Sequence, residues 1–428
     1  MSIAQKYLFV CFSFIVFSCS STPLSRFDYA EIPADFFGIV HAGDTGTAEE
    51  YLLLDELGAN WVLNTFYWES IEREKDHFDF SHYDNYVDTA KREGKKIIAV
   101  LGYETAWLFP ERKQKRFISR ENIPLFLRFV AEMVQHFKGR VDVWQVWNEP
   151  NIPRFWQGSK KVFFELSSLT TLKIKETDPD AYILGGGFSL APRWFTRGMH
   201  KAGALENLDG ISFHPYGINP SHSMKVYDKF LNILSEIKYS KPIWITEVGF
   251  PTGGWYPTRV SLEKYPSYII KTITGAAARG PQLLLWYHMF DSRNKGEISR
   301  FFKSSEKFFG LVYPDYSRKD GAWAYELCAA FLPGSTYISN YIERVNIPKT
   351  IISLCFLEGK SGFNTLVLWN DKSGSSKINL YLPAPAYLHD ISNGEKTPLQ
   401  EETMLSIGKT PLFITWQGED VPRLVMIK

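Results

Sequence analysis

Short apolar runs alternate with longer segments of helical periodicity between residues 36 and 333. In the helical segments apolar residues recur at intervals of three and four, as in 124–137, where the pattern ends just before Gly139. The apolar runs have the length of strands and lie at 37–41, 61–65, 97–101, 141–147, 182–185, 211–214, 242–246 and 283–287. Strands that alternate with helices pair in parallel, and eight such units in roughly 300 residues have the size of a (β/α)8 barrel. The pattern therefore predicts an α/β fold with a (β/α)8 TIM barrel over residues 36–333.

The pattern changes after Gly334, where runs of β-branched and apolar residues replace the alternation. These runs include 350–356, 365–369 and 412–416, and turn residues such as those at 370–374 separate them. A succession of short strands is typical of two sheets packed face to face. We expect residues 334–428 to form a small accessory β-sandwich that holds no catalytic group.

The first 18 residues have the pattern of an export signal, in which one charge, Lys6, precedes an apolar run at 7–17. That run is much shorter than the roughly 20 residues of a membrane-spanning helix. Cys19 follows Ser18 in a segment that resembles a bacterial lipobox, where the cysteine carries the lipid and becomes the first mature residue. We predict a lipoprotein signal at 1–18, a tether at 19–35 and an exported protein held at a membrane through Cys19. Cleavage as an ordinary signal would instead leave a secreted or periplasmic protein.

The charge of the chain argues against a nucleic-acid partner. Lys and Arg number 48 against 47 Asp and Glu, and loss of Lys6 with the signal leaves 47 of each. Because no long run of one charge is present, counterion release cannot drive binding to a polyanion. Beyond Cys19, the cysteines Cys328 and Cys355 have no metal-ligand spacing, and we expect two buried thiols rather than a disulfide.

Polar side chains gather where the predicted strands end, which is where a (β/α)8 barrel builds its active site. The residues in question are Trp-Asn-Glu-Pro-Asn at 147–151, His-Pro-Tyr at 214–216, Thr-Glu at 246–247 and Trp286. On the seventh strand Ile243, Ile245 and Glu247 share one face, so Glu247 points into the barrel mouth if the isoleucines face the interior. A carboxylate in that position is costly without a purpose or a partner.

Two carboxylates on strands four and seven, facing across a barrel mouth, suit glycoside hydrolysis. One of them protonates the leaving oxygen, and the other attacks or activates water. Glu149 alone has a second interpretation, because Asn and Pro are ordinary turn residues and a Glu often lies in the first turn of a helix. Glu247 at the end of another strand, with His214 and Tyr216 between, favours an active site.

Three segments carry a resemblance to a known group of enzymes. Gln-Val-Trp-Asn-Glu-Pro-Asn at 145–151, Phe-His-Pro-Tyr at 213–216 and Trp-Ile-Thr-Glu at 244–247 resemble the retaining glycoside hydrolases of clan A. Trp68, Ile-Glu at 71–72, Phe-Asp-Phe at 78–80, Tyr-Asp at 83–84 and Phe-Trp at 155–156 are most similar to family 39 enzymes such as β-xylosidases. The resemblance covers most of residues 36–330.

The resemblance implies roles for individual residues. It implies Glu149 as the acid/base and Glu247 as the nucleophile. It further implies that Asn148 bonds a sugar hydroxyl beside the reacting carbon and that Tyr216 bonds the nucleophile. Trp286 is implied as a platform under the bound sugar, although a tryptophan on strand eight can equally fill the barrel wall.

Histidines and further tryptophans have both a functional and a structural interpretation. We place His214 and His41 among the substrate-binding residues, although single histidines are more often hydrogen-bonded structural residues. Tryptophans in the loops after strands either stack further sugars or pack within the protein. Those considered are Trp107, which we include in the site, Trp156 and Trp255.

The chain departs from family 39 on the second strand. Family members usually place an Arg at the position of Leu63, which is followed here by Asn64. That Arg helps keep the nucleophile ionised. We expect Glu247 to rely on Tyr216 and Asn148 instead, with Asn64 as a partial substitute, and the acid limb of the pH profile to lie higher than in relatives.

Three functions fit the sequence. The first is an exported retaining glycosidase with a carbohydrate substrate and neither a metal nor an organic cofactor. The second is a surface lipoprotein that binds carbohydrate without turnover, which Leu63 favours and the two intact glutamates oppose. The third is a transglycosylase that uses the same intermediate. The sequence carries no signal for the sugar, the anomer, endo or exo action, or the oligomeric state.

Overall fold

The computed structural model describes residues 28–44, 46–109, 116–254, 259–292, 302–383 and 385–427. The predicted export signal, the lipidation site at Cys19 and Trp255 lie outside these residues. Within the described ranges, no helix combines the length and the apolar character needed to cross a membrane. The chain folds into two compact units.

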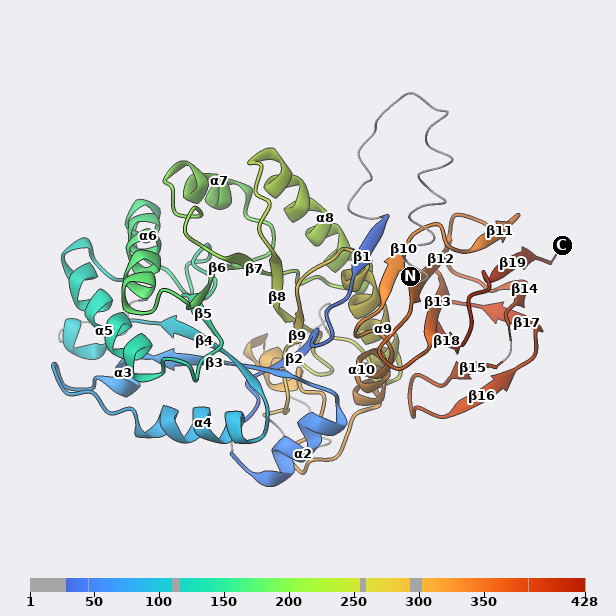
Figure 1. Cartoon of the computed structure of the whole chain (residues 1–428), viewed down its shortest axis with the longest axis horizontal. Coiled ribbons are helices and arrows are strands. Elements are labelled where there is room, and N and C mark those ends of the chain that lie inside the picture. Colours follow the sequence, from blue (N-terminus) through green and yellow to red (C-terminus); the bar gives the residue numbers. More distant parts are fainter. Residues whose placement is uncertain are drawn as a thin grey trace. The chain divides into compact units, whose positions relative to one another are not determined.

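The barrel unit comprises Phe37–Gly249 and Gln282–Asp291. Its strands pair in parallel in chain order and close into a barrel (Figure 1). They are β2 (Phe37–Val40), β3 (Trp61–Tyr67), β4 (Lys96–Gly102), β5 (Val143–Val146), β6 (Tyr182–Ser189), β7 (Gly210–His214), β8 (Ile243–Val248) and β9 (Leu284–Trp286). The predicted (β/α)8 barrel is confirmed.

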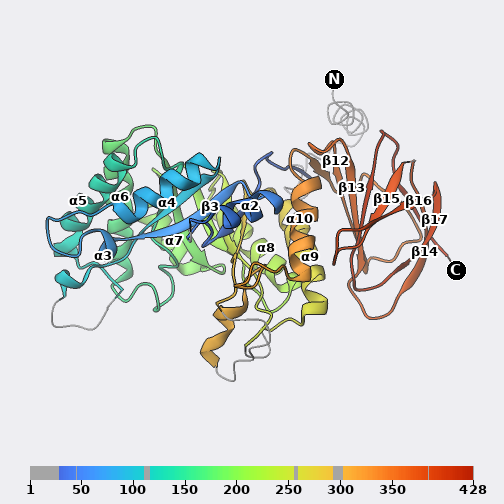
Figure 2. The ribbon, with the colours of Figure 1, turned by 90° about the horizontal axis from the view of Figure 1, so that it is seen from below.

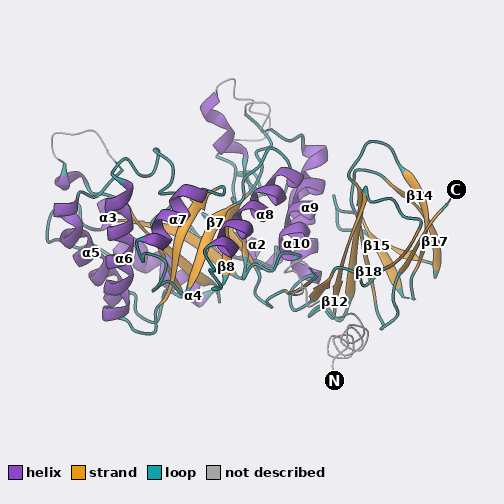
Figure 3. Ribbon diagram, turned by 90° about the horizontal axis from the view of Figure 1, so that it is seen from above, coloured by secondary structure: helices purple, strands orange, loops and turns teal. Residues whose placement is uncertain are grey.

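Helices follow the strands and lie outside them in the barrel unit (Figure 3). They are α2 (Ala48–Glu56), α3 (Trp68–Ile71), α4 (Ser81–Arg92), η1 (Ala106–Leu108), η2 (Arg120–Asn122), α5 (Ile123–His136), α6 (Lys160–Thr177), α7 (Arg193–Lys201) and α8 (Pro220–Glu236). Side-chain caps begin two of them, because Thr47 accepts from the N–H of Glu50 at 3.3 Å and Asn219 from that of His222 at 2.9 Å. These local signals set where each helix starts after its strand.

The inside of the barrel is an apolar cluster to which β2 to β6, β8 and β9 contribute side chains. Its members include Val40, Trp61, Leu63, Ile98, Val143, Leu184, Trp244, Leu283 and Leu285. Side chains alternate along a strand, so the residues between these point outwards to the helices. Phe213 on β7 is one, and its ring lies 4.3 Å from that of Phe230 on α8. Its neighbour His214 therefore faces inwards, above the cluster.

The sandwich unit comprises residues 28–36, Phe250–Pro281 and the described residues from Ser292 onwards. One sheet has the order β1-β10-β12-β13-β18-β15-β16 and the other β11-β19-β14-β17. The strands are β1 (Tyr29–Glu31), β10 (Thr336–Ile338), β11 (Glu343–Val345), β12 (Ile351–Leu357), β13 (Asn364–Asn370), β14 (Ser376–Tyr381), β15 (Ala386–His389), β16 (Lys396–Leu399), β17 (Glu402–Ile407), β18 (Leu412–Trp416) and β19 (Arg423–Met426). Leu366 and Ile414 of the first sheet share one buried core with Ile378 and Leu424 of the second, so the predicted β-sandwich is present (Figure 2).

Two parts of the sandwich unit differ from the expected division of the chain. Strand β1 lies inside the segment expected to be a tether and pairs antiparallel with β10, because three residues are too few to show an alternating pattern. Helices α9 (Tyr265–Ala277) and α10 (Asp320–Phe331), with η3 (Leu262–Lys264) and η4 (Phe302–Phe308), group with the sandwich rather than with the barrel unit. The ring of Phe331 at the end of α10 lies 5.0 Å from that of His389 on β15. The units therefore do not divide at residue 333.

The two cysteines of the sandwich unit are buried free thiols, as expected. Burial raises the pKa of both Cys328 and Cys355 well above the ordinary value of a thiol. Neither thiol is therefore poised as a nucleophile.

Candidate active site

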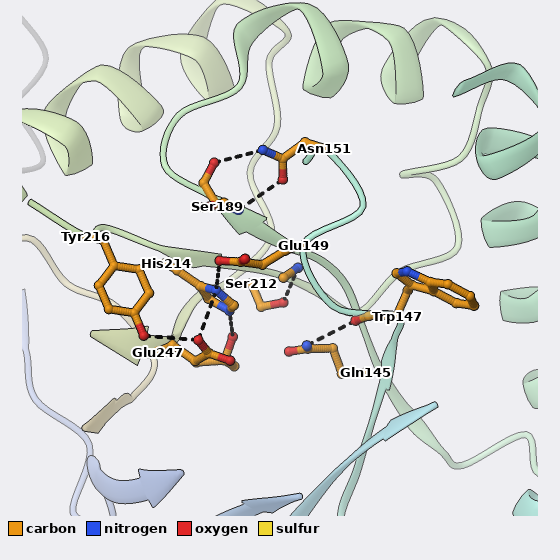
Figure 4. Close-up of polar contacts among 11 residues, drawn as sticks. Gln145, Trp147, Glu149, Asn151, Ser189, Ser212, His214, Tyr216 and Glu247 are labelled. Carbon is orange, nitrogen blue, oxygen red and sulfur yellow. Dashed lines mark hydrogen bonds and ion pairs between the residues drawn. The ribbon is translucent and has the colours of Figure 1, made fainter. Parts of the chain in front are cut away.

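The carboxyl ends of β5, β7 and β8 bring Glu149, His214 and Glu247 together (Figure 4). One nitrogen or oxygen from each side chain lies within 4.8 Å of those of the other two. The side chain of His214 is fully buried, and those of Glu149 and Glu247 are 10% and 13% exposed. The structure thus joins the two predicted carboxylates across the mouth of the barrel.

A tight backbone turn after β5 positions Glu149. Trp147 and Glu149 both have left-handed φ angles, of 66° and 46°, which costs a residue other than glycine roughly 1 kcal/mol or more. Two hydrogen bonds hold this turn. The indole Nε1 of Trp147 donates to the carbonyl of Phe155 at 2.9 Å, and the N–H of Glu149 donates to the carbonyl of Gly187 at 2.9 Å. The turn directs the carboxyl group of Glu149 towards His214 (Figure 4).

Gly187 on β6 allows this turn to approach the neighbouring strand. Its φ is +51°, and a Cβ atom there would lie 2.8 Å from Nε2 of Gln145 and 3.3 Å from Oδ1 of Asn148. Its N–H donates to Oγ of Ser212 on β7 at 2.8 Å. Both the backbone conformation and the lack of space therefore require glycine at this position.

Glu247 reaches the mouth through an irregularity in β8. Trp244 belongs to the interior cluster, so alternation turns Ile245 and the other isoleucine of this strand outwards. The expectation that the isoleucines face the interior is therefore wrong. The register between β8 and β9 shifts between Ile245 and Val248, and such a bulge re-aims the side chains beside it. Thr246 and Glu247 consequently both reach His214.

His214 contacts three polar groups. Its Nδ1 lies 2.9 Å from Oε1 of Glu149 and 3.5 Å from Oε2 of Glu247, and its Nε2 lies 3.2 Å from Oγ1 of Thr246. Burial by itself lowers the pKa of His214, but the charges of Glu247 and Glu149 and the hydrogen bond to Glu149 outweigh it. The pKa of His214 therefore lies above the ordinary value of histidine.

The hydroxyl of Tyr216 donates to Oε2 of Glu247 at 3.1 Å, so the hydrogen bond that the family resemblance implies is present. Burial and the nearby charges of Glu247 and Glu149 raise the pKa of Tyr216 well above its ordinary value. Tyr216 is therefore a neutral donor that holds one oxygen of Glu247 in place.

Glu149, His214 and Glu247 also form the one group among the described residues whose ligand atoms lie close enough to hold a metal ion. The hydrogen bond between His214 and Glu149 and that between Tyr216 and Glu247 account for the arrangement without an ion. Chemically, a buried pair of carboxyl groups with a proton donor beside each can exchange a proton with a bound molecule and attack it.

Trp286 does not occupy the expected place. Leu285 belongs to the interior cluster, so alternation along β9 turns Trp286 outwards, where its side chain is fully buried. The next residue, Tyr287, packs against the interior cluster, and its ring lies 6.4 Å from that of Tyr216. Tyr287 therefore lies beside the carboxyl pair at the position expected for Trp286.

Asn148 and His41 both lie at the mouth of the barrel. The side chain of Asn148 is half-buried and forms a hydrogen bond with Tyr103, a buried residue that follows β4. His41 follows β2, and its ring lies 6.0 Å from that of Tyr287. Burial lowers the pKa of His41, so its ring is neutral at pH 7. The prediction that these two residues bind substrate stays a prediction.

Two of the predicted tryptophans are engaged in packing. Nε1 of Trp107 donates to the carbonyl of Glu72 at 2.8 Å, and its ring lies edge-on to that of Trp68. Trp156 is 5% exposed and lies edge-on to Trp147. Trp107 keeps part of its surface exposed at the catalytic end of β4, whereas Trp156 is a packing residue.

Neither Leu63 nor Asn64 places a charged or polar group inside the barrel. Leu63 belongs to the apolar interior cluster. Asn64 lies on the opposite face of the strand, where its Nδ2 donates to Oδ1 of Asp44 at 2.6 Å. Asn64 is therefore not the substitute donor that the sequence suggested.

Several residues of the site were missed in the sequence. Tyr103 and Tyr287 lie at strand ends, and the argument that identified Glu149 and Glu247 applies to them equally. Thr246 was noted at the end of its strand but was given no role, because it alternates with Glu247 on a regular strand. A bulge places both side chains in the site, and the sequence carries no clear signal for it.

Comparisons with known proteins relate this chain to glycoside hydrolases. Residues 35–165 match the model of glycosyl hydrolase family 10. This range contains Glu149 and ends before Glu247. Endo-1,4-beta-xylanase B of Thermotoga neapolitana is 26% identical over 229 residues, which are 48% of this chain and 63% of the xylanase. The chain thus matches less than two thirds of the length of that relative.

Solved structures of family 39 enzymes share the fold. A family 39 glycoside hydrolase from the gut symbiont Bacteroides cellulosilyticus WH2 has a TM-score of 0.74 at 21% identity, over 92% of this chain and 82% of that one. A family 39 β-xylosidase from Caulobacter crescentus has a TM-score of 0.61 at 18% identity, over 91% of this chain and 98% of that one. The structural matches confirm the predicted resemblance to family 39 at the level of the fold. The match to the family 10 model and to the xylanase supports a glycosidase.

Proposed function

We propose that this chain, a relative of the clan A xylanases and xylosidases, is a retaining β-glycosidase that acts on xylosyl substrates. Glu247 is the nucleophile and Glu149 the acid/base. Neither a metal nor an organic cofactor enters this chemistry, because carboxyl groups supply both steps. The xylosyl specificity is inferred from the names of the relatives.

The short distance between the carboxyl groups carries this proposal. An oxygen of Glu149 and one of Glu247 lie within 4.8 Å of each other. Carboxyl groups about 5 to 5.5 Å apart favour direct attack and retention, whereas about 6.5 to 9.5 Å leaves room for a water molecule and inversion. The spacing therefore supports a double displacement.

The hydrogen bonds divide the two roles between the carboxyl groups. Tyr216 fixes Oε2 of Glu247 at 3.1 Å, which supports an oriented, ionised nucleophile. Glu149 begins the reaction protonated and gives its proton to the leaving oxygen as Glu247 bonds to the anomeric carbon. Glu149, now a carboxylate, then deprotonates the water that releases the sugar.

A panel of nitrophenyl glycosides tests this function. We expect the β-xyloside to be cleaved fastest and the α-xyloside not at all, with the β-glucoside and β-galactoside as comparisons. Product analysis on xylan then separates hydrolysis from transfer to a second sugar, because the same intermediate serves both. A protein that binds xylan but cleaves none of these glycosides would instead be the non-catalytic carbohydrate-binding module.

Gly187→Ala is expected to disturb the acid/base. An added Cβ meets Nε2 of Gln145 at 2.8 Å, so this amide must move and its hydrogen bond to the carbonyl of Trp147 in the turn of Glu149 is disturbed. We expect kcat/KM to fall about tenfold or more. Gly139→Ala is the matched control, since Gly139 also has a positive φ, of +72°, but open space around its Cβ position. Both changes should cost about 1 kcal/mol of stability, and only Gly187→Ala should lower kcat/KM. Equal kcat/KM values for the two variants would contradict the role given to Gly187.

The proposal extends to the location of the protein. We propose that Cys19 carries a lipid and holds the mature chain at a membrane. We expect the wild type to sediment with membranes and Cys19→Ala to be released or to accumulate unprocessed. Ser18→Ala, a neighbouring change that keeps the cysteine, is the control. An unchanged membrane fraction for Cys19→Ala would rule out the anchor.

A further inference from the structure

The segment after β4 carries a carboxyl group that the mechanism above does not use. Glu104 is 8% exposed, and its Oε2 has no hydrogen-bond partner among the described residues. Burial raises the pKa of Glu104, although its own backbone N–H and the charge of Arg116 act in the opposite direction. A buried carboxyl oxygen without a partner costs free energy, and a donor on a bound molecule would recover it.

The residues that follow Glu104 are held in place by hydrogen bonds. The hydroxyl of Thr105 donates to Oε2 of Glu69 on α3 at 2.9 Å. Nε1 of Trp107 donates to the carbonyl of Glu72, the residue after α3, at 2.8 Å. These bonds fix the segment to the neighbouring element. Glu104 therefore has a defined position although its Oε2 makes no bond of its own.

Tyr103, the residue before Glu104, connects this segment to the active site. Its side chain forms a hydrogen bond with that of Asn148, and its ring lies 5.0 Å from that of Trp147. Burial is the main cause of the raised pKa of Tyr103, and the negative charge of Glu247 adds to it. Glu104 is thus one residue away from a side chain that lies beside the proposed nucleophile.

A guanidinium group lies against the same tyrosine. The guanidinium carbon of Arg116 is 4.2 Å from the centre of the Tyr103 ring, and arginine commonly packs on an aromatic face in this way. The charge of Arg116 acts on Glu104, so the two groups are near each other, yet Arg116 does not donate to Oε2 of Glu104. A donor and an acceptor therefore lie close together without bonding.

This arrangement fits two adjacent hydroxyl groups of a sugar. One hydroxyl can donate to the carboxyl oxygen while the next accepts from the guanidinium. Glu69 adds a negative charge near Glu104, so the position suits a neutral sugar rather than an anionic group. The partly exposed ring of Trp107 offers an apolar surface on which the face of a sugar can pack.

Resting on the function proposed above, we propose that Glu104, Arg116 and Trp107 form a second sugar-binding position beside the one at the carboxyl pair. Glu104 accepts a hydrogen bond from one hydroxyl of the sugar, and Arg116 donates to the neighbouring hydroxyl. The chain then binds substrates of two or more sugars and recognises a unit next to the one that Glu247 attacks.

Equilibrium binding of xylose, xylobiose and xylotriose tests this position. Calorimetry in a Glu247→Ala background avoids loss of the ligand through turnover. We expect xylobiose and xylotriose to bind more tightly than xylose, and Glu104→Met to weaken both about tenfold while leaving xylose unchanged. Arg116→Met should have the same effect. Glu121→Ala is the control, because it removes an exposed carboxylate from η2, which follows the same strand, and it should change none of the three affinities.

A stability measurement separates binding from a structural role. Since Oε2 of Glu104 has no partner in the described structure, an apolar side chain of similar length should not lower the free energy of unfolding. We therefore expect Glu104→Met to unfold at the same denaturant concentration as the wild type or a higher one. Lower stability with unchanged affinities would show a structural carboxyl group and overturn the inference.

The binding results keep the inference and the proposed function apart. Equal effects of Glu104→Met on xylose and xylobiose, or no binding of any of the three sugars, would overturn the second position. If the expected pattern appears but the wild type cleaves no glycoside, the proposed function alone fails. If the wild type cleaves β-xylosides but Glu104→Met binds xylobiose as tightly as its parent, the inference alone fails.

Discussion

Glu247→Ala is expected to abolish turnover on every glycoside, whatever its leaving group. The carboxylate of Glu247 forms the bond to the anomeric carbon, so without it no intermediate exists for water to cleave. We expect kcat/KM to fall by about 10⁴-fold or more, as for the loss of other catalytic nucleophiles. The rates on dinitrophenyl and on phenyl β-xylosides should fall together, because a better leaving group cannot replace the missing nucleophile.

Glu93→Ala is the control for removal of a carboxylate. Glu93 is exposed and lies at the end of α4, at the opposite end of the barrel unit from the strand ends that carry Glu149 and Glu247. It should retain wild-type kcat/KM. Substantial turnover in Glu247→Ala, confirmed with protein free of wild type, would show that another group is the nucleophile.

Glu149→Ala is expected to separate substrates by leaving group. Dinitrophenolate departs without a proton, so formation of the intermediate should be largely spared, whereas substrates that need protonation should lose about 10² to 10⁴-fold. The intermediate then accumulates because no base activates water. Added azide needs no such base, and it should restore turnover and give a glycosyl azide of retained configuration.

The two glutamate variants check each other. Azide should rescue Glu149→Ala and leave Glu247→Ala without the retained product. Equal losses on both leaving groups in Glu149→Ala, without any effect of azide, would remove Glu149 from the acid/base role. The hydrogen bond from Gln145 to the carbonyl of Trp147 would then support a turn whose glutamate has another role.

Much of the fold was predictable because buried parallel strands read as apolar runs. The run predicted at 97–101 lies within β4, which extends from Lys96 to Gly102. Strand β6 shows where this signal fails. It was expected to end at Gly185 but continues to Ser189, because three successive glycines have the composition of a turn and a register shift between Gly185 and Phe188 carries the strand past them.

The part of the candidate site that follows from the order of the strands along the chain was predictable. Glu149 and Glu247 could be paired because each ends a strand of a predicted barrel. Which of two successive side chains faces the mouth depends on register, which composition does not reveal. Trp286 was therefore predicted to face the mouth, where the structure instead has Tyr287. Glu247 was correctly predicted to face the mouth, but from the wrong premise that the isoleucines of its strand face the interior. The position of His214 between the two carboxyl groups is a property of three strands together, so no single segment signals it.

The stereochemistry of the first product tests the central claim most directly. Proton NMR of a β-xyloside mixed with the wild-type protein records the anomeric configuration of the xylose before it mutarotates. Attack by Glu247 followed by attack of water inverts the anomeric carbon twice, so the account predicts that β-xylose appears first and α-xylose grows in later. If α-xylose appears first, water attacks directly, and the assignment of Glu247 as a nucleophile 4.8 Å or less from Glu149 is contradicted.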